Sequence, residues 1–159
     1  ARMRLAVTAG AEHMTASLAR VMLYRRKDLI DSAAEPIRTL LAWHALEEIE
    51  HKSVCFDLYQ LAGGSYRQRV IALLFAFIDT LRLVHARHKY FLQHDGLWNW
   101  RTRVAIVTRV WGPTGIIGQL IPELLRYLRP GFHPWQTDER ADFEQQWKTL
   151  LSDLERQAA

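Results

Sequence analysis

Two histidines and a glutamate recur at helical spacing within an apolar part of the chain, residues 43–51, and this feature most limits the possible fold. At about 100° per residue, His44, Glu48 and His51 share one face of a helix. Several apolar side chains lie within about 60° of the same direction, namely Ile37, Leu40, Leu41, Leu58 and Tyr59. An apolar stripe of this kind normally faces a core, so we expect the three polar side chains to point inward.

A glutamate and a histidine three residues apart are able to hold one metal ion. Glu48 and His51 have this Glu-x-x-His spacing, which metal-carrying helix bundles place on inward-facing helices. Iron, manganese and zinc accept mixed carboxylate and imidazole ligands. The spacing also arises by chance, and the alternative is a charged helix in which His44 and His51 are satisfied core histidines. Glu47 lies on the flank of the same face, whereas Glu50 points away and is expected on the surface.

The chain before this segment predicts a helix over residues 4–25 with one carboxylate, Glu12, in a stripe of apolar and small residues. The other members of the stripe are Leu5, Thr8, Ala9, Ala16, Ala19 and Leu23. Pro36 begins a second predicted helix, residues 36–62, which ends at Gly63 and Gly64. In an antiparallel hairpin, Glu12 and Glu48 each lie about 18 residues from the turn and reach the same height. The alternative for Glu12 is a helix-edge carboxylate paired with an arginine.

The rest of the chain also has helical periodicity, and no strand pattern is evident. We expect helices over residues 66–93, 101–111, 115–127 and 139–156. Pro122 should bend or interrupt its helix, and Thr137 or Asp138 should cap the last one. Residues 129–136, rich in proline and aromatic side chains, predict a rigid loop that inserts Phe132 and Trp135 into the bundle. The predicted fold is an all-α bundle of about five to six helices in one domain, residues 1–159, with a metal-binding hairpin (1–62) followed by C-terminal helices (63–159).

The remaining histidines and the cysteine are ambiguous. His85 and His88 fit a solvated helix end better than an anion or metal site, and His13 lies on the shoulder of the Glu12 face. His133 is either a ligand or part of the loop that anchors the aromatic side chains. Cys55 fits a small core residue better than a metal ligand. A single cysteine rules out an internal disulfide and fits a reducing compartment such as the cytoplasm.

Composition excludes several classes of partner. The chain has 21 Lys and Arg against 17 Asp and Glu, a net charge of +4. No basic run interleaves with aromatic residues, so we expect no nucleic-acid partner. The longest apolar run, residues 70–78, is far shorter than the ~20 residues of a membrane-spanning helix, so we expect no integral membrane segment. The sequence begins at Ala1 in an already helical pattern, and we expect a fragment of a longer protein.

Three separated motifs resemble the family of predicted metal-dependent hydrolases placed among the ferritin-like helical proteins. They are residues 11–16, residues 43–52 with 56–59, and residues 127–135. The resemblance implies a ferritin-like bundle with a dinuclear site, in which Glu12 is the single glutamate and Glu48 with His51 the paired ligands. Only one such set is found here. The resemblance thus implies half of a site, completed by a missing N-terminal half or by a second copy of the chain.

These observations leave several functions open. The favoured one is a metal-dependent hydrolase of an unknown small molecule, in which iron is preferred over manganese or zinc. Glu47 or His44 would then orient a ligand or move a proton. A di-iron oxidase or oxygenase on the same scaffold and a non-catalytic helical interaction module are the alternatives. A weaker one is a peripheral membrane protein, suggested by the basic end of helix 66–93 and by Trp98 and Trp100.

Overall fold

The computed structural model describes residues 1–136 and 140–158, and every regular element among them is helical. In chain order the elements are α1 (Arg2–Arg20), η1 (Val21–Arg25), α2 (Asp28–Asp31), α3 (Ile37–Glu50), α4 (Val54–Leu61), α5 (Tyr66–His94), α6 (Trp100–Ile106), η2 (Val107–Trp111), α7 (Ile116–Tyr127), η3 (Pro134–Gln136) and α8 (Arg140–Ala158). The all-α prediction is confirmed for these residues. Five of the six predicted helices lie close to their expected bounds, and the expected cap of α8 at Thr137 or Asp138 lies outside the described residues.

The predicted helix over residues 36–62 is wrong in one respect, because it is two helices. α3 ends at Glu50 and α4 begins at Val54, with a turn over residues 51–53 between them. Contacts from other elements stabilise the new helix start. Glu12 of α1 accepts a hydrogen bond from the backbone N–H of Cys55 (2.9 Å), so one of the donors released by the break is satisfied.

Side-chain caps and glycines set the other helix ends. Ser65 accepts a hydrogen bond from the N–H of Gln68 at the start of α5, and Asn99 does so from Thr102 at the start of α6. Gly63 ends α4 with a φ of 72°, as its place after the predicted helix suggested. α7 continues past Pro122, and the predicted interruption does not occur. Core residues on both sides of the proline hold the helix, namely Leu120, Leu124 and Tyr127.

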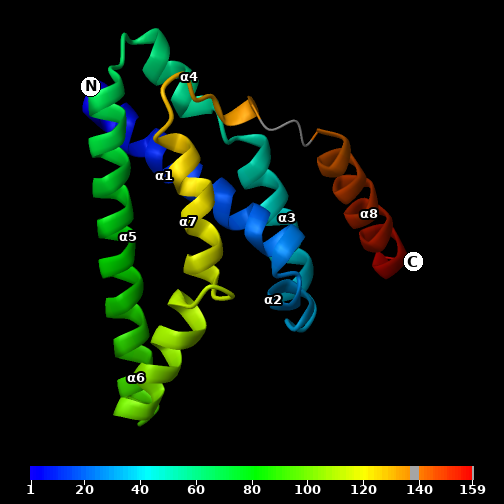
Figure 1. The fold of residues 1–159 in the computed structure, drawn as a ribbon. Coiled ribbons are helices and arrows are strands. Elements are labelled where there is room, and N and C mark those ends of the chain that lie inside the picture. The colour runs from blue at the N-terminus through cyan, green and yellow to red at the C-terminus, as the bar shows by residue number, and fades with distance from the viewer. Residues whose placement is uncertain (137–139, 159) are drawn as a thin grey trace.

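Helix α1 lies at the centre of the fold and packs against α3, α4, α5 and α7 (Figure 1). Its small side chains permit this position. A Cβ atom added at Gly10 would lie 3.1 Å from the Cα of Leu73, so α1 and α5 approach closely there. The predicted stripe is confirmed at Ala16 and Ala19, which are buried, but Thr8 is exposed.

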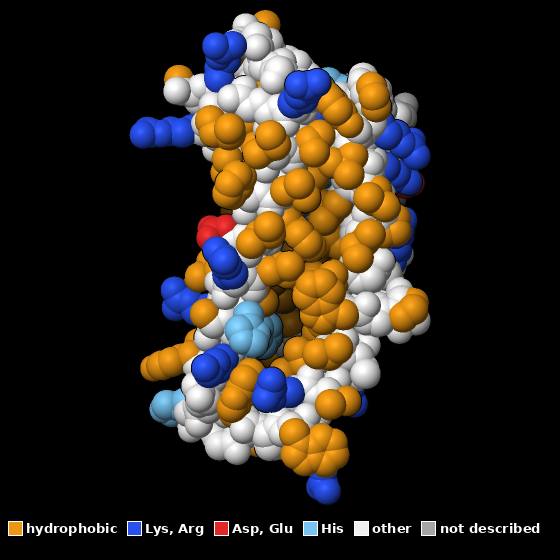
Figure 2. Space-filling view, turned by 60° about the vertical axis from the view of Figure 1, so that its left-hand side comes forward, with side chains coloured by type: hydrophobic (Ala, Val, Ile, Leu, Met, Phe, Trp, Pro, Cys, Tyr) orange, Lys and Arg blue, Asp and Glu red, His pale blue; other side chains and the backbone are white. Residues whose placement is uncertain are grey.

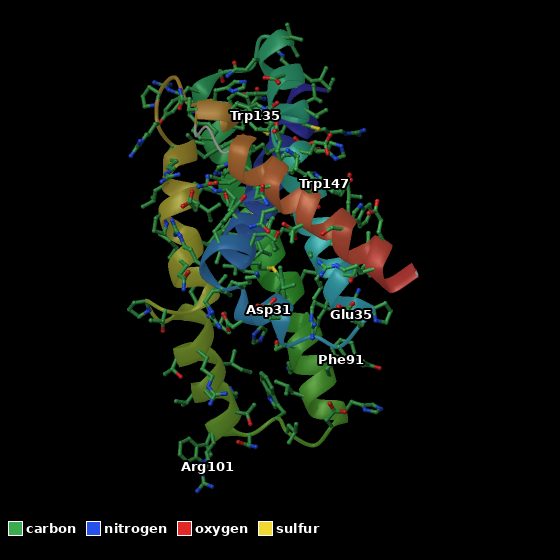
Figure 3. All side chains as sticks on the ribbon, turned by 90° about the vertical axis from the view of Figure 1, so that its right-hand side faces the viewer. Asp31, Glu35, Phe91, Arg101, Trp135 and Trp147 are labelled. Atoms are coloured by element: carbon green, nitrogen blue, oxygen red, sulfur yellow. The ribbon has the colours of Figure 1, made fainter. Side chains whose placement is uncertain are left out.

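Two apolar clusters form most of the core. The first joins α1, α4, α5, α7 and the loop after α7, with Phe56, Leu73, Tyr127 and Phe132 among its members. Phe132 therefore inserts as predicted. The second cluster joins α1, α3 and α8 around Ile49. Figure 3 shows α8 crossing the bundle on that side, where its Trp147 packs against this cluster.

Helices α6 and η2 run beside the C-terminal half of α5, away from both clusters (Figure 1), and contain no buried residue. Among the described residues, one segment, Trp100–Tyr127, is long and apolar enough to cross a membrane by length and composition alone. We did not expect this segment from the sequence, because the longest apolar run, residues 70–78, lies elsewhere. A turn at residues 112–115 divides it, and α7 beyond the turn contributes Leu120, Leu124 and Tyr127 to the core.

Candidate metal centre

The outer face of α3 carries His44 and Glu48 in contact with each other. The distance between His44 Nε2 and Glu48 Oε1 is 3.5 Å, and the two side chains are 63% and 28% exposed. They lie one helical turn apart, which brings such pairs together. His51 follows directly after the last residue of α3 and is exposed. Glu47, on the flank of the face, is half-buried.

This face does not point into the core, contrary to the prediction. The buried residues of α3 are Ala45, Leu46 and Ile49, which lie on the opposite side of the helix. Ile37 and Leu40, expected in the core, are 51% and 54% exposed, and Leu58 is also exposed. The physical reason is that α3 is apolar on both sides, and α1 packs against the side that contains the small Ala45. Glu50 is exposed, as predicted.

Glu12 is half-buried and has a structural partner. Its Oε2 accepts the hydrogen bond from Cys55 N in the first turn of α4, where the helix dipole also favours a negative charge. Glu12 thus performs from α1 the capping role that a local side chain usually performs. The predicted alternative, pairing with an arginine, is not what is found.

Cys55 packs against the first core cluster. Burial, together with the neighbouring Glu12 carboxylate, raises the pKa of its thiol to about 11. The thiol is therefore protonated at neutral pH and is a poor nucleophile. The expectation that Cys55 is a small core residue is confirmed.

The predicted ligands do not converge on one point. Glu12 contacts the start of α4, and Glu48 contacts His44. Within residues 1–136 and 140–158, no group of three or more His, Cys, Asp or Glu side chains is arranged to hold a metal ion. The donor types suit a divalent cation, but the chain by itself presents them as an incomplete set.

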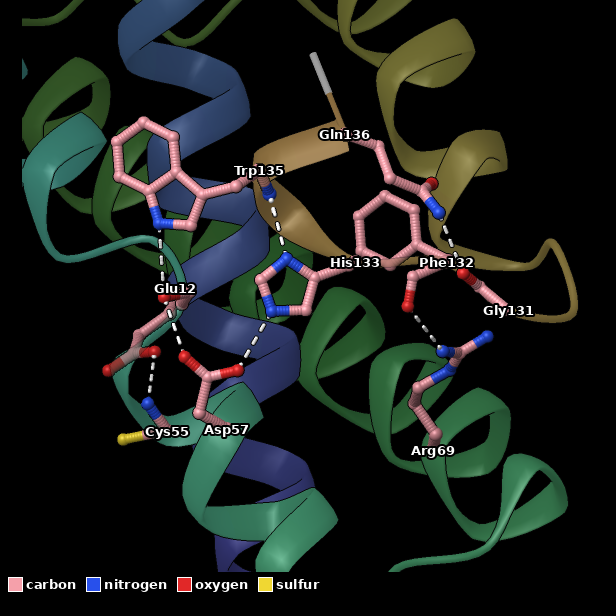
Figure 4. Close-up of polar contacts among 10 residues, drawn as sticks. Glu12, Cys55, Asp57, Arg69, Gly131, Phe132, His133, Trp135 and Gln136 are labelled. Carbon is pink, nitrogen blue, oxygen red and sulfur yellow. Dashed lines mark hydrogen bonds and ion pairs between the residues drawn. The ribbon is translucent and has the colours of Figure 1, made fainter. Parts of the chain in front are cut away.

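A second polar cluster, which the sequence analysis did not predict, joins α4 to the loop after α7 (Figure 4). His133 Nε2 lies 2.9 Å from Asp57 Oδ1, and Ser53 donates to Asp57 Oδ2 (2.9 Å). Trp135 donates twice, from its backbone N–H to His133 Nδ1 (3.2 Å) and from its indole N–H to Ser53 Oγ (3.1 Å). Because Nδ1 accepts, the neutral His133 ring carries its proton on Nε2 and donates it to Asp57.

This cluster anchors the loop. Both nitrogens of His133 are bonded within it, so His133 is neither a free base nor a free ligand. Lys52 lies against the face of the Trp135 ring, with Nζ 3.9 Å from the ring centroid. The anchoring role that the sequence left open for His133 is the one found. The spacing of Ser53 and Asp57, one helical turn apart, was the available signal.

Arg69 is a buried guanidinium, 3% exposed, that holds the same loop from α5. It donates to the carbonyl oxygens of Arg129 (2.7 Å) and Phe132 (3.4 Å). Four aromatic rings surround it, with centroids 5.1–5.8 Å from Cζ, those of Phe56, Tyr66, Tyr127 and Phe132. Burial lowers the pKa of Arg69. A charged residue directly before the apolar run 70–78 was the sequence signal for this position.

His13 and Glu123 form a third buried polar group between α1 and α7. His13 Nε2 lies 3.1 Å from the carbonyl oxygen of Glu123, so this nitrogen carries the proton. The ring stacks on Tyr127 at 4.7 Å. Burial lowers the pKa of His13 from its ordinary value of 6.5 to about 4, which outweighs its hydrogen bond to Glu123. His13 is therefore neutral at physiological pH.

The Glu123 carboxylate, 2% exposed, is surrounded by arginines. It lies 2.9 Å from Arg25, 3.0 Å from Arg126 and 3.5 Å from Arg20. The pairs with Arg20 and Arg25 tie α7 to the end of α1 and to η1, whereas the pair with Arg126 lies within α7. The only signal for them in the sequence is an acidic residue, Glu123, within an apolar helix.

Comparison with known proteins identifies one family. The model of a family described as predicted metal-dependent hydrolase matches residues 1–138. No curated protein and no solved structure shows significant similarity to the chain.

Proposed function

The chain belongs to the family of predicted metal-dependent hydrolases, and from this premise we propose that Glu12, Glu48 and His51 hold its divalent metal ion. We propose iron as this ion, with manganese as the alternative, because a set with more carboxylates than imidazoles suits these two metals better than zinc. The substrate is a small molecule with a hydrolysable bond. A bound cation of this kind lowers the pKa of a water molecule and polarises the bond to be cleaved.

The observation that carries the proposal is the His44–Glu48 contact on the exposed face of α3. It shows a carboxylate and an imidazole already within reach of each other and open to solvent. In this arrangement His44 orients the Glu48 carboxylate and accepts a proton from a neighbouring water. Glu47, half-buried on the flank, is the second proton acceptor. Glu12 Oε2 bonds to Cys55 N at the start of α4, so the proposal requires this region to rearrange for Glu12 to reach the ion held by Glu48 and His51.

The set is completed by a second helical hairpin packed on the outer face of α3, as in a ferritin-like bundle. Either a second copy of this chain or a further segment supplies that hairpin. Support comes from the apolar side chains beside His44, since Ile37, Leu40 and Trp43 are all exposed. A helix that is apolar on all sides is normally covered on all sides.

The test is the metal content of the purified protein, by elemental analysis, for the wild type and three variants. Glu48→Ala and His51→Ala should lose the metal. Glu50→Ala is the matched control, because Glu50 lies on the same helix, is exposed, and points away from the face. Retention of metal in Glu48→Ala, or equal loss in Glu50→Ala, would contradict the ligand assignment. Light scattering on the same samples shows whether metal binding accompanies dimer formation.

A second candidate, a non-catalytic helical module, is favoured by the separation of the predicted ligands among the described residues. In that case Glu48→Ala leaves metal content unchanged and alters only assembly.

An oxidase or oxygenase with two irons is distinguished from a hydrolase by its activity. Oxygen consumption by the iron-loaded protein supports the former, and ester hydrolysis without oxygen supports the latter.

A further inference from the structure

The arm formed by residues 80–111, which comprises the C-terminal half of α5, α6 and η2, exposes large apolar side chains. They are Leu83, Val84, Tyr90, Phe91, Leu97, Trp100, Val104, Val107 and Trp111, each 44–68% exposed. A groove of about 230 Å³ runs between α5 and α6–η2, with His85, Trp98 and Val107 in its lining. Figure 2 shows apolar side chains along this side of the molecule, including the arm, with a hollow beside a histidine. A contiguous exposed surface of large apolar side chains usually marks an interaction site.

The positive charge of the chain is concentrated in the same arm. Residues 80–111 carry six basic side chains and one acidic side chain, a net charge of +5. The remaining residues carry 15 basic and 16 acidic side chains, a net charge of −1. The six basic residues are Arg82, Arg87, Lys89, Arg101, Arg103 and Arg109. In the part of the chain that the structure describes, none of the six forms an ion pair.

Arginine and tryptophan side chains are paired at the tip of the arm. Arg101 lies over the Trp100 ring (5.4 Å) and Arg103 over the Trp98 ring (5.5 Å). Figure 3 shows Arg101 and Phe91 at the end of the molecule opposite Trp135, far from the anchored loop. Tryptophan is favoured at the boundary between lipid headgroups and hydrocarbon, and basic side chains beside it meet lipid phosphates.

We propose that the arm binds the surface of an anionic lipid bilayer, with its apolar side chains in the interfacial region and its basic side chains on the phosphates. Interfacial helices have this combination of an apolar face, tryptophan and Lys or Arg. The arm lies on the membrane and does not cross it. α6 and η2 together span about 18 Å, against ~30 Å of hydrocarbon.

A second copy of the chain is a less suitable occupant of this surface. A symmetric dimer would place the same patch on both sides of the interface. Two arms of net charge +5 would then face each other, and like charges oppose such contact. An anionic bilayer offers the complementary charge. This proposal does not depend on the metal site, which lies on α3.

The test is co-sedimentation of the whole chain with vesicles of phosphatidylcholine alone and of phosphatidylcholine mixed with phosphatidylserine. Binding should require phosphatidylserine, weaken in high salt, and shift tryptophan emission to the blue. Arg101→Gln with Arg109→Gln should weaken partitioning about 30-fold, from ~1 kcal/mol for each charge near the surface. The matched control is Arg4→Gln with Arg67→Gln, two exposed arginines outside the arm, which should bind as the wild type does.

A separate variant tests the apolar contribution. Trp100→Ser with Val104→Ser should weaken binding at least about tenfold, while circular dichroism stays unchanged because neither side chain is buried. Absence of binding to the mixed vesicles at low salt would overturn the proposal, as would equal weakening by the control pair. The surface would instead belong to a second copy of the chain if two results came together. The protein would not bind vesicles, and it would form a dimer in solution that Trp100→Ser with Val104→Ser dissociates.

Discussion

The loop after α7 and the outer face of α3 both carry histidines and carboxylates, but the two regions use them differently. Around the loop, His133 and Asp57 bond to each other and to groups on separate elements. On α3, His44 and Glu48 contact each other within one helix and remain open to solvent. A polar group tied to several elements positions the fold, whereas one tied to nothing beyond its own helix is available to a ligand.

The energetic consequence is a large difference in what each substitution should cost. Removing a buried polar group leaves its former partners unsatisfied in a low-dielectric interior. An exposed ion pair contributes little, since water replaces it. We therefore expect a large loss of stability when the buried Arg69 is replaced, a smaller loss at the Asp57–His133 pair, whose side chains are 48% and 40% exposed, and almost none on the outer face of α3.

The largest effect is expected for Arg69→Ala. The substitution removes the guanidinium donor from the carbonyl oxygens of Phe132 and Arg129, of which Arg129 keeps the Phe132 N–H, and it opens a cavity between aromatic rings. We expect a loss of about 4 kcal/mol in the free energy of unfolding, measured by urea denaturation. The matched control is Arg67→Ala, an exposed arginine on the same helix, which should change stability by less than about 0.5 kcal/mol. Equal effects of the two variants would remove the assigned role of Arg69.

The next largest effect concerns the pH dependence of stability through His13. Burial lowers the pKa of His13 to about 4 from 6.5 in the unfolded chain. As the pH falls below 6.5, the unfolded chain binds a proton that the folded protein does not bind until about pH 4, so stability is lost across this window. At ~1.4 kcal/mol per pH unit, the loss from this group reaches about 3 kcal/mol near pH 4.

The variant His13→Gln isolates this group. Glutamine keeps an N–H donor for the Glu123 carbonyl oxygen but does not titrate. Urea denaturation between pH 7 and pH 4 should show a smaller fall in stability for the variant than for the wild type. If both proteins lose the same stability over this range, another group causes the loss.

Helix positions followed from the sequence because their signals are local. Apolar periodicity and the glycines at 63–64 located α1, α5 and the end of α4. The break after Glu50 had no local signal, since the side chain that caps α4 comes from Glu12, 43 residues earlier. The acceptors of Arg69 lie 60 and 63 residues away in the chain, and Arg25 lies 98 residues from Glu123, so only the folded structure reveals these contacts.

The orientation of α3 could not be derived from periodicity for a related reason. Its apolar residues occur on both sides, so the sequence places His44, Glu48 and His51 on an apolar stripe without indicating what covers it. The prediction assumed that the core of this chain does so. In the structure α1 covers the side of Ala45, Leu46 and Ile49. Which side of α3 faces α1 depends on how closely the two helices can approach each other.

A smaller effect is expected for Asp57→Ala, which removes the acceptor shared by Ser53 and His133. The Asp57 side chain is about half exposed, so water compensates part of the loss. We expect a decrease of about 1 kcal/mol in the free energy of unfolding. Limited proteolysis by chymotrypsin after Trp135, in the same loop, should also become faster, because the loop loses one anchor. A variant as resistant to cleavage as the wild type would show that the remaining contacts, those of Arg69 and of Trp135 with Ser53, hold the loop without Asp57.

The smallest effect on stability is expected for Glu48→Ala, and this result would sharpen the comparison most. In metal-free protein the variant should differ from the wild type by no more than about 0.5 kcal/mol, because the His44–Glu48 contact is exposed. Glu50→Ala should show the same small change. Added metal should then stabilise the wild type and Glu50→Ala but not Glu48→Ala. This difference in the free energy of unfolding would come from metal binding and not from the fold, since a ligand stabilises only the state that binds it. A large loss of stability in metal-free Glu48→Ala would instead place Glu48 with the structural carboxylates around the loop.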